Sequence, residues 1–422
     1  MILLKNGTFI DWRSLEFRQT DILVGSEARE PLQFNPDRLS FTADKVIDCK
    51  GKYITRSFAC GHHHVYSALA RGMGAPKKNP ENFNEILQYI WWTLDKALDP
   101  EIIRSSALVT AMACAKNGVT FAIDHHASPF AVKGSLDIIA RAFDEVGVGH
   151  LLCYEISDRD GPDIARRGLE ETENYLAENQ GLVGLHASFT VGDATLKQAV
   201  QLAAGTRSGI HIHLAEGISD QEHCVQKYGM RVTERLADAG VLQFPKTILG
   251  HCLHLTDHER GLIKGSVAWV VENMESNLNN GVGFFNSRDL GPRIMLGTDG
   301  MHSNMLQSAK STFFAGHNWD AIDYAETYRR FRNVHNYLKY NAFTGDGDNN
   351  LVILDYDTPT PFNTQNFPGH FLFGIESGHI SHVISNGKLI VDKGNILTVN
   401  ESEILQESRI LASRLWERMS RI

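Results

Sequence analysis

The stretch PEIIRSSALVTAMACAKNGVTFAID, residues 100–124, shows the alternation on which the predicted fold rests. Residues 100–115 carry apolar side chains at helical spacing, and Gly118 follows as a signal that stops the helix. Residues 119–124 then form an apolar run of strand length. A helix that leads at once into a buried strand is typical of a parallel sheet with helices packed on its faces.

The same step from helix to strand recurs through the middle of the chain. Three more helical patterns each lead through a glycine into an apolar strand: 136–146 into 151–156, 195–204 into 210–215, and 231–239 into 247–251. At 422 residues, one (β/α)₈ TIM barrel and a small accessory domain would account for the whole chain.

Both ends of the chain favour strands instead. Short β-like runs fill residues 2–54, and the pattern turns to strands again after residue 349, where Asn386-Gly387 is typical of a tight hairpin turn. We therefore predict a small β-sandwich built from both termini. The expected boundaries are 1–54 and 349–400 for the sandwich, 55–348 for the barrel and 401–422 for a C-terminal helix.

Composition favours a soluble, globular protein. Hydrophobic residues make up 42% of the chain and charged residues 22%, and the formal net charge is −9. An acidic balance argues against a nucleic-acid or anionic-membrane partner. No apolar run approaches the roughly 20 residues of a membrane span, and the N-terminus lacks the pattern of a secretory signal. We therefore expect a cytoplasmic protein, with its six scattered cysteines reduced.

The informative residues are histidines and acids at the ends of predicted strands. The first group is Cys60-Gly61-His62-His63-His64. Alternate side chains of a strand face the same way, so His62 and His64 can converge on one metal while His63 faces away. The alternative is a polar loop that happens to hold adjacent histidines.

The second group is His211-Ile212-His213-Leu214-Ala215-Glu216. His213 ends a predicted strand, and Glu216 follows where the catalytic loops of a barrel lie. A carboxylate beside an activated water is the proton shuttle that a hydrolase needs. The alternatives are a core role for His211, and for Glu216 an acid placed at a helix N-terminus by the helix dipole.

Two more apolar strands end in the same way, one at His251 and one at Asp299. A lone aspartate at such a place is often a turn or helix-cap residue. However, the carboxyl ends of parallel barrel strands share one rim, so all four groups would meet there. The set therefore predicts a metal site at the mouth of the barrel.

The order His62-x-His64, His213-x-x-Glu216, His251, Asp299 resembles the amidohydrolase superfamily, in its cytosine deaminase-like and chlorohydrolase-like branch. More narrowly, residues 64–72, 124–128, 154–161 and 351–361 look like the SsnA group of aminohydrolases. The resemblance implies the barrel with its terminal β-sandwich. It also implies one divalent metal ion, zinc first and iron second, held by His62, His64, His213 and Asp299.

The resemblance also implies the roles of the remaining groups. A metal-activated hydroxide would attack the substrate, and Glu216 would carry its proton to the ring and then to the leaving amine. His251 would hold the hydroxide and stabilise the developing charge, and Asp299 would accept a proton as well as bind the metal. One departure is Arg56-Ser57, which stands where the superfamily usually has Pro-Gly and removes no ligand.

Relatives with two metals usually carry a lysine on the fourth strand. Residues 181–188, which correspond to that strand, contain no lysine, and this favours a single ion. Glu155 on the third strand could still bridge a second ion. The alternative is a structural salt bridge from Glu155 to Arg159 or another base.

Candidate substrate contacts are His186 and His302, which should face the rim, then His125, and Trp92 in the long first loop. The alternative for the histidines is hydrogen bonding behind the ligands. Residues 73–93 hold several aromatic side chains that could cover a flat heterocycle as a lid. They could equally form an apolar helix packed on the barrel or on a second subunit.

We predict a hydrolase that deaminates a small nitrogen heterocycle such as a purine, pyrimidine or triazine. The alternatives are hydrolysis of a cyclic amide, displacement of chloride, and a homologue that binds without turnover. The H-x-E and P-C-x-x-C signature of nucleic-acid deaminases is absent. The expected partners are the small-molecule substrate and a second copy of the chain, because superfamily members are commonly dimers or larger.

Overall fold

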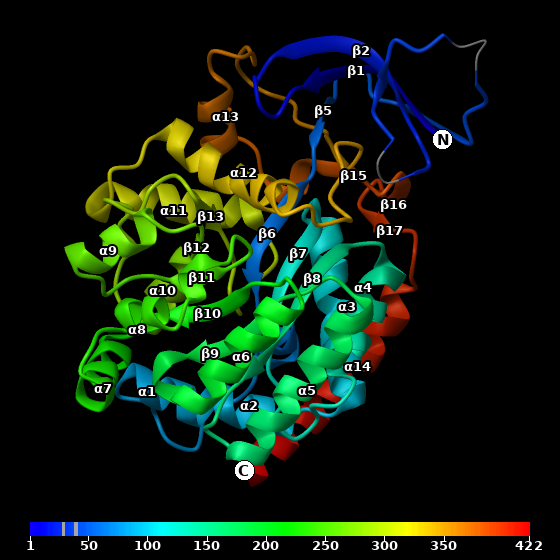
Figure 1. Ribbon diagram of the computed structural model, residues 1–422. Coiled ribbons are helices and arrows are strands. Elements are labelled where there is room, and N and C mark those ends of the chain that lie inside the picture. Colours follow the sequence, from blue (N-terminus) through cyan, green and yellow to red (C-terminus); the bar gives the residue numbers. More distant parts are fainter. Residues whose placement is uncertain (28–29, 38–40) are drawn as a thin grey trace.

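The computed structural model describes residues 1–27, 30–37 and 41–422. Its centre is a barrel of eight parallel strands in which each strand pairs with the next along the chain (Figure 1). The strands are β6 (Phe58–His63), β7 (Val119–His126), β8 (Gly149–Ile156), β9 (Val183–Ala187), β10 (Ile210–Leu214), β11 (Ile248–His251), β12 (Trp269–Glu272) and β13 (Ile294–Leu296).

The seam between the first and last strands closes the barrel. The backbone N–H groups of Thr298 and Asp299 donate to the carbonyl of His62 at 3.0 and 3.1 Å. The His64 N–H donates to the carbonyl of Asp299 at 3.4 Å, and His63 forms a parallel bridge with Asp299. The expected (β/α)₈ barrel is therefore confirmed, and its closure lies at the residues that the sequence singled out.

Helices surround the barrel on the outside (Figure 1). They are α3 (Pro100–Lys116), α4 (Ser135–Val146), α5 (Pro162–Glu178), α6 (Asp193–Gly205), α7 (Ile218–Tyr228), α8 (Val232–Asp238), α9 (Asp257–Lys264), α10 (Met274–Asn280), α11 (Met305–Trp319) and α12 (Tyr324–Tyr340). The side chain of Asp99 caps α3 by accepting the Ile102 N–H at 3.0 Å. Gly147 ends α4 with a left-handed φ of 88°, as its position in the sequence predicts.

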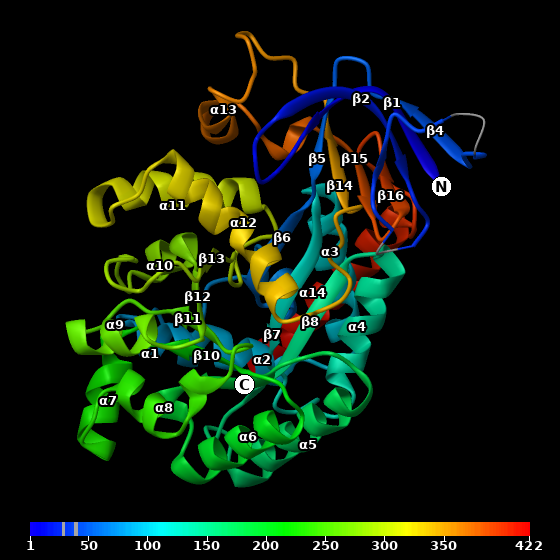
Figure 2. The same cartoon turned by 45° about the horizontal axis from the view of Figure 1, so that its top comes forward.

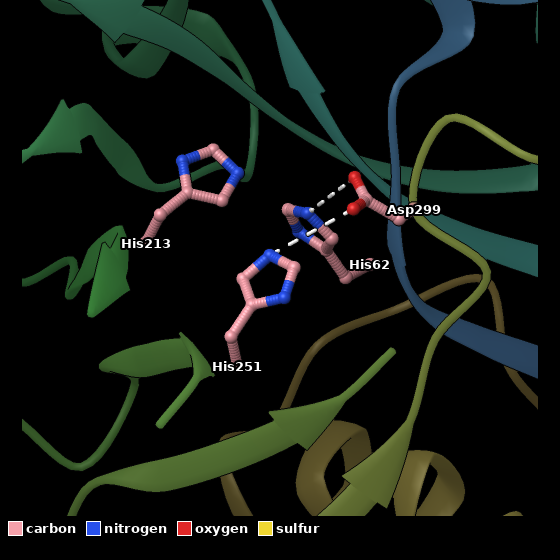
Figure 3. A group of neighbouring side chains, drawn as sticks. All are labelled: His62, His213, His251 and Asp299. Carbon is pink, nitrogen blue, oxygen red and sulfur yellow. Dashed lines mark ion pairs between the residues drawn. The ribbon is translucent and has the colours of Figure 1, made fainter. Parts of the chain in front are cut away.

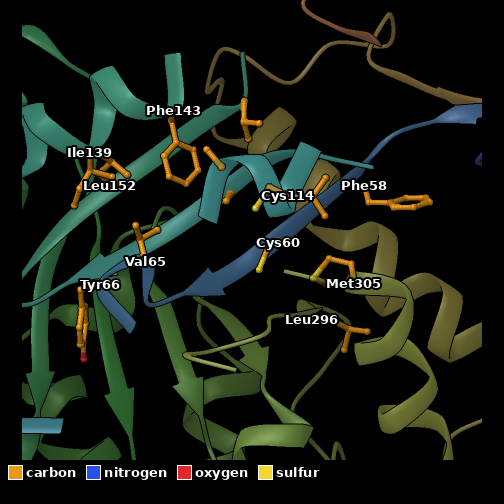
Figure 4. Packing of buried hydrophobic residues seen from close by; sticks show 14 of the residues in the cluster. Phe58, Cys60, Val65, Tyr66, Cys114, Ile139, Phe143, Leu152, Leu296 and Met305 are labelled. Carbon is orange, nitrogen blue, oxygen red and sulfur yellow. The ribbon is translucent and has the colours of Figure 1, made fainter. Parts of the chain in front are cut away.

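Two apolar cores flank the barrel wall. Outside, side chains of β6, β7 and β8 pack against α3 and α4, and Figure 4 shows Cys60, Cys114, Phe143 and Leu152 among them. Inside, Phe121, Leu151, Met295 and their neighbours form a second core, to which Tyr337 of α12 also belongs. Strands that are buried on both faces explain the nearly continuous apolar runs in the sequence.

The two ends of the chain form a separate mixed sheet (Figure 2). From the N-terminal part come β1 (Ile2–Ile10), β2 (Phe17–Val24), β3 (Gln33–Phe34), β4 (Lys45–Asp48) and β5 (Tyr53–Arg56). From the C-terminal part come β14 (Leu351–Leu354), β15 (Ile380–Ser385), β16 (Lys388–Asp392) and β17 (Asn395–Ile396). Because β14 lies between β5 and β15, the β-domain from both termini is confirmed.

Local details of this β-domain also follow the sequence. One edge of β1 pairs with β2, and the other edge is divided between β4 and β5, so the sheet branches around its own apolar core. Asn386 and Gly387 have φ values of 49° and 73°, as the hairpin between β15 and β16 requires. In the Arg56-Ser57 pair that precedes β6, Arg56 forms a buried ion pair with Asp346 at 2.8 Å.

The chain ends in two further helices, α13 (Phe367–Phe373) and the long α14 (Glu401–Arg421). The helix α14 runs beside α3 on the outside of the barrel (Figure 1). The indole N–H of Trp416 donates to the carbonyl of Leu69 at 2.8 Å, and Arg414 pairs with Asp99 at 2.9 Å. The predicted C-terminal helix therefore anchors the first loop of the barrel.

The seam gives a test of the fold. A Cβ atom added at Gly297 would lie 2.4 Å from Asn273 Oδ1 and 2.9 Å from both Cβ and the carbonyl oxygen of His62. We expect Gly297→Ala to destabilise the protein by about 1–3 kcal/mol, because overpacking forces the backbone apart. Urea unfolding measures this change in stability.

The matched control is Gly261→Ala in α9, where an added Cβ meets open space. There alanine should leave stability unchanged or raise it by about 0.5–1 kcal/mol, because glycine is unfavourable inside a helix. Equal stability of the two variants would contradict the tight seam.

Candidate metal centre

Three histidines and one aspartate converge at the mouth of the barrel. His62 lies on β6, His213 on β10 and His251 at the end of β11, and Asp299 lies in the turn after β13. One ligand atom of each lies within 4.8 Å of those of the others, and all four residues are buried. Figure 3 shows the carboxylate of Asp299 facing the rings of His62 and His251.

His64 belongs to the same centre. Its Nε2 atom lies 2.9 Å from Asp299 Oδ1 and 3.2 Å from His213 Nε2. The Nε2 atom of His62 lies 3.4 Å from the same Asp299 oxygen. The structure therefore brings together the four side chains expected as ligands, His62, His64, His213 and Asp299.

Hydrogen bonds behind the rings fix which nitrogen faces the centre. His64 donates its Nδ1–H to the carbonyl of His125 at 2.6 Å, and His213 donates its Nδ1–H to the carbonyl of His186 at 2.8 Å. The Nδ1 atom of His62 shares a hydrogen bond of 2.9 Å with His211 Nε2. In a neutral ring, a proton on Nδ1 leaves the Nε2 lone pair for a ligand, which is how metal-binding histidines are usually held.

The unpartnered atoms fit a divalent cation. Among the described residues, the Nε2 atoms of His62 and His251 are buried and have no hydrogen-bond partner. Three imidazole nitrogens and one carboxylate are a donor set that suits zinc and similar ions. The residues present therefore fit the metal that the sequence led us to expect.

Charges around the centre also favour a cation. Burial opposes ionisation of Asp299, yet His64 and His62 hold its pKa well below the usual range. Burial lowers the pKa of His62 to about 3. Burial would likewise lower the pKa of His64, but the charge of Asp299 outweighs it and raises that pKa to about 9. A positive charge between His64 and Asp299 is thus stabilised by the site.

The backbone adopts an unusual conformation at three strand ends beside the site. Ala215, His251 and Asp299 have φ values of 49°, 67° and 53°, in the left-handed region that residues other than glycine seldom adopt. Each follows or ends a barrel strand. Strain of this kind persists where the surrounding structure enforces it, and it is typical of functional sites.

Glu216 and His251 face each other next to the ligands. Glu216 Oε2 lies 3.6 Å from His251 Nε2, which in turn lies 3.7 Å from Asp299 Oδ2. His251 Nδ1 shares a hydrogen bond of 2.7 Å with Asn277 Oδ1, so its Nε2 atom points into the site. Burial and the charge of Asp299 raise the pKa of Glu216. This arrangement can hold and move a proton.

A small cavity of about 40 Å³ opens onto these groups. His186 and Trp92, both expected as substrate contacts, lie on its wall, with their rings 6.1 Å apart. His186 is held by a hydrogen bond of 2.6 Å between Nδ1 and the hydroxyl of Thr190, and burial lowers its pKa to about 4. It is therefore a neutral ring at pH 7.

The cavity is covered by residues 83–97, which we call the strap. The strap consists of α1 (Phe83–Ile86), a π-helical turn (Leu87–Trp91) and α2 (Trp92–Ala97). Its side chains on the cavity are Phe83, Leu87, Trp91 and Trp92. The structure therefore agrees with the first of the two interpretations of this loop, in which its aromatic side chains cover the site.

Two ion pairs attach the strap to the loop after β8. Arg159 pairs with Asp95, and Lys96 lies 2.9 Å from Asp160. The guanidinium of Arg159 also lies 5.2 Å from the ring centroid of Trp92. These contacts fix α2 across the mouth of the barrel.

His125 and His302 lie away from the cavity. His125 is fully buried and donates its Nε2–H to the carbonyls of Leu185 and His211, at 3.2 and 3.1 Å. His302 lies 2.5 Å from Glu275 and accepts the Asn304 N–H on its other nitrogen. Neither side chain lines the cavity, and both rings are hydrogen-bonded to other groups.

Sequence reasoning missed two supporting residues. His211 precedes His213 by two residues on one strand, so both face the barrel interior, and this period could have marked His211 as the partner of His62. Asn277 lies on α10, far along the chain from His251, and nothing in the sequence pairs them. His63 turns away as expected and bonds to Ser303 at 3.0 Å.

A parallel barrel whose mouth carries a buried histidine–carboxylate centre defines a class of metal-dependent hydrolases. The model of the amidohydrolase family matches residues 53–346. The chain therefore belongs to the amidohydrolase family, whose members depend on a metal ion. This confirms the family expected from the motifs, while the narrower likeness to the SsnA group stays a prediction.

Comparisons with individual proteins agree with this family. The chain is 26% identical to the 5-methylthioadenosine/S-adenosylhomocysteine deaminase of Thermoanaerobacter pseudethanolicus, over 99% of this chain and 100% of that protein. Its fold is similar to that of an adenosine deaminase from Xanthomonas campestris with bound zinc, with a TM-score of 0.83, 18% identity and 98% of each chain covered.

A second solved structure shows the same fold. This is the atrazine chlorohydrolase of Arthrobacter aurescens TC1 in complex with zinc, with a TM-score of 0.81 and 15% identity over 98% of this chain and 100% of that one.

Within the described residues, no helix combines the length and the apolar character that crossing a membrane would take.

The ligand assignment gives a second test. We expect His213→Ala to lower the metal bound per chain to well under half, because a nitrogen that faces the centre is lost. The control His63→Ala changes a neighbouring histidine that faces Ser303, and it should keep full metal content. Elemental analysis of the purified proteins measures both, and full occupancy in His213→Ala would refute the assignment.

Proposed function

We propose that this protein is an aminohydrolase that releases ammonia from a ring carbon of a small nitrogen heterocycle. The observation that carries the proposal is the pair formed by Glu216 and His251, 3.6 Å apart beside the cluster of ligands. A metal site alone needs neither group, whereas hydrolysis needs both a proton carrier and a group that orients the attacking water. The completeness of this set argues against a homologue that binds without turnover.

We assign zinc, held by His62, His64, His213 and Asp299, as the metal. Three imidazoles and a carboxylate suit this borderline ion, and two similar folds were solved with zinc. When bound, the ion supplies a Lewis acid that makes water a nucleophile at neutral pH. The attacking water and the ring carbon can meet in the cavity beside these ligands.

The protein's own groups then handle the protons. Glu216 can take a proton from the attacking water and pass it to a ring nitrogen and finally to the leaving amine, because its raised pKa favours the protonated form. His251 holds the oxygen of the attacking water through Nε2, since Asn277 occupies its other nitrogen. Asp299 is the second carboxylate beside His251 and can accept the second proton.

The cavity wall supplies the remaining contacts. The neutral ring of His186 and the indole of Trp92 offer one polar and one flat apolar surface to a heterocycle. The side chains of His125 and His302 are not among the proposed substrate contacts. His125 orients His64 through its backbone carbonyl, and His302 pairs with Glu275. The relatives named as deaminases of adenosine-type purines place purines first among compounds to assay.

The third test removes the proton carrier. Glu216→Gln should keep its metal but lose about 10²–10⁴-fold of turnover, which is the usual contribution of a positioned general acid or base. Ammonia release from a panel of purines, pyrimidines and triazines measures the rate, with the metal content of each preparation known. The control is Glu222→Gln, an exposed carboxylate on α7.

Two outcomes would contradict the proposal. Unchanged turnover in Glu216→Gln would remove the proton role of that residue. Release of chloride, or ring opening without ammonia, would favour the chlorohydrolase or cyclic-amide alternative. The cytoplasmic location and the homodimer stay predictions.

A further inference from the structure

Glu155 is a buried acid that the proposed reaction does not use. It lies near the end of β8 with 5% of its surface exposed, on the wall of the cavity that holds Glu216 and Asp299. One of its carboxylate oxygens lies within 4.8 Å of the ligand nitrogens of His64 and His213. Besides its ion pairs with His125 and Arg159, a side chain so close to the reacting position can contact a second ion or the substrate.

The partners of Glu155 leave one oxygen open. Its Oε2 atom lies 3.2 Å from His125 Nδ1. Its Oε1 atom lies 3.7 Å from Arg159 Nη1, which is too long for a hydrogen bond, and no other donor to Oε1 is found in the described residues. Because Glu155 borders the cavity, a ligand that fills the cavity can donate a hydrogen bond to this oxygen.

A second metal ion fits this position poorly. His64 and His213 each have one free ring nitrogen, because both Nδ1 atoms bind backbone carbonyls, and those free nitrogens face Asp299 and each other. Only His125 and Glu155 would then belong to a second ion alone.

Arg159 is the only arginine or lysine on the cavity wall in the described part of the chain, and it is not free to bind an anion. It pairs with Asp95, and its Nε donates to Asp160 at 3.1 Å. Its charge is therefore compensated within the protein. The cavity thus offers a bound heterocycle carboxylate oxygens from Glu155 on one side and from Glu216 and Asp299 on the other.

We propose that Glu155 is a specificity-determining residue, which accepts a hydrogen bond from an N–H in the six-membered ring of the substrate. This inference rests on the proposed function. Heterocycles whose six-membered ring carries an N–H can satisfy the open oxygen; guanine has this N–H beside the reacting carbon, and cytosine has it on the opposite side of the ring. The six-membered ring of an N9-substituted adenine has no such donor, so this site should differ from the relatives named for adenosine-type compounds.

Binding without turnover tests the proposal. Metal-loaded Glu216→Gln protein is titrated by calorimetry with two matched pairs, guanine with 1-methylguanine and cytosine with 1-methylcytosine. At least one N–H member should bind about tenfold or more tightly than its N-methyl partner, as expected for a hydrogen bond to a charged group. Adding Glu155→Gln or Glu155→Asp should reduce that preference to within about threefold.

The control is Asp160→Asn in the same background. This change disturbs the ion pairs of Arg159 and Lys96, but Asp160 does not line the cavity, so the preference should remain. A preference that survives both Glu155 variants, no preference at all, or no binding of any N–H member would overturn the proposal. Failure of the ammonia assay together with a Glu155-dependent preference would instead count against the proposed reaction alone.

Metal content tests the remaining alternative, a second cation bound at Glu155. One ion per chain in both wild-type protein and Glu155→Gln is expected. Two ions per chain, with one lost in Glu155→Gln, would overturn the proposal in favour of a second cation at Glu155. Thermal unfolding of each variant shows whether it remains folded at the temperature of the titration.

Discussion

The hydrogen bonds between β6 and the turn after β13 are the constraint on which the rest of this structure depends. They close the barrel, and they are made by the backbone of the same residues whose side chains form the metal centre. The carbonyl of His62 accepts two N–H groups from Thr298 and Asp299, so the ring of His62 and the carboxylate of Asp299 are placed by one junction. Closure of the sheet and the placing of His62 beside Asp299 therefore depend on the same hydrogen bonds. If the first and last strands separated, His62 and Asp299 would also move apart.

The backbone of the neighbouring strands then orients the rings. His64 on the first loop is held by a carbonyl of β7, and His213 on β10 by a carbonyl of β9. These two carbonyls belong to His125 and His186, residues that the sequence marks for their side chains. Because the strands are parallel, the ends of adjacent strands meet at one rim and supply both the ligand and the group that fixes its tautomer. This explains why histidines gather at consecutive strand ends even where only some of them face the cavity.

The fold could be predicted from the sequence because its decisive signals are local. The helical spacing of residues 100–115 and the apolar run that follows became α3 and β7, with ends that differ by no more than two residues. The ligands could be named because a histidine or acid at the end of a barrel strand can face only one rim. The direction of His302 could not be predicted, because it depends on Glu275, which lies on another helix. The π-helical turn of the strap and the pairing of His251 with Asn277 likewise depend on contacts between distant segments, for which short-range patterns carry no information.

Arg159 links the cover of the site to its interior. The same guanidinium pairs with Asp95 of the strap, lies against the ring of Trp92 and faces the carboxylate of Glu155. Asp95 is buried, and although Arg159 opposes the effect of burial, the pKa of Asp95 is raised to about 7. One cation thus stabilises acids both on the strap and on the cavity wall, and it cannot be displaced by a negatively charged substrate without leaving buried carboxylates unpaired, which is strongly unfavourable. A neutral or positively charged ring would therefore suit the cavity as the proposed substrate, and displacement of the strap would change the charge environment of Glu155 at the same time as it opens the cavity.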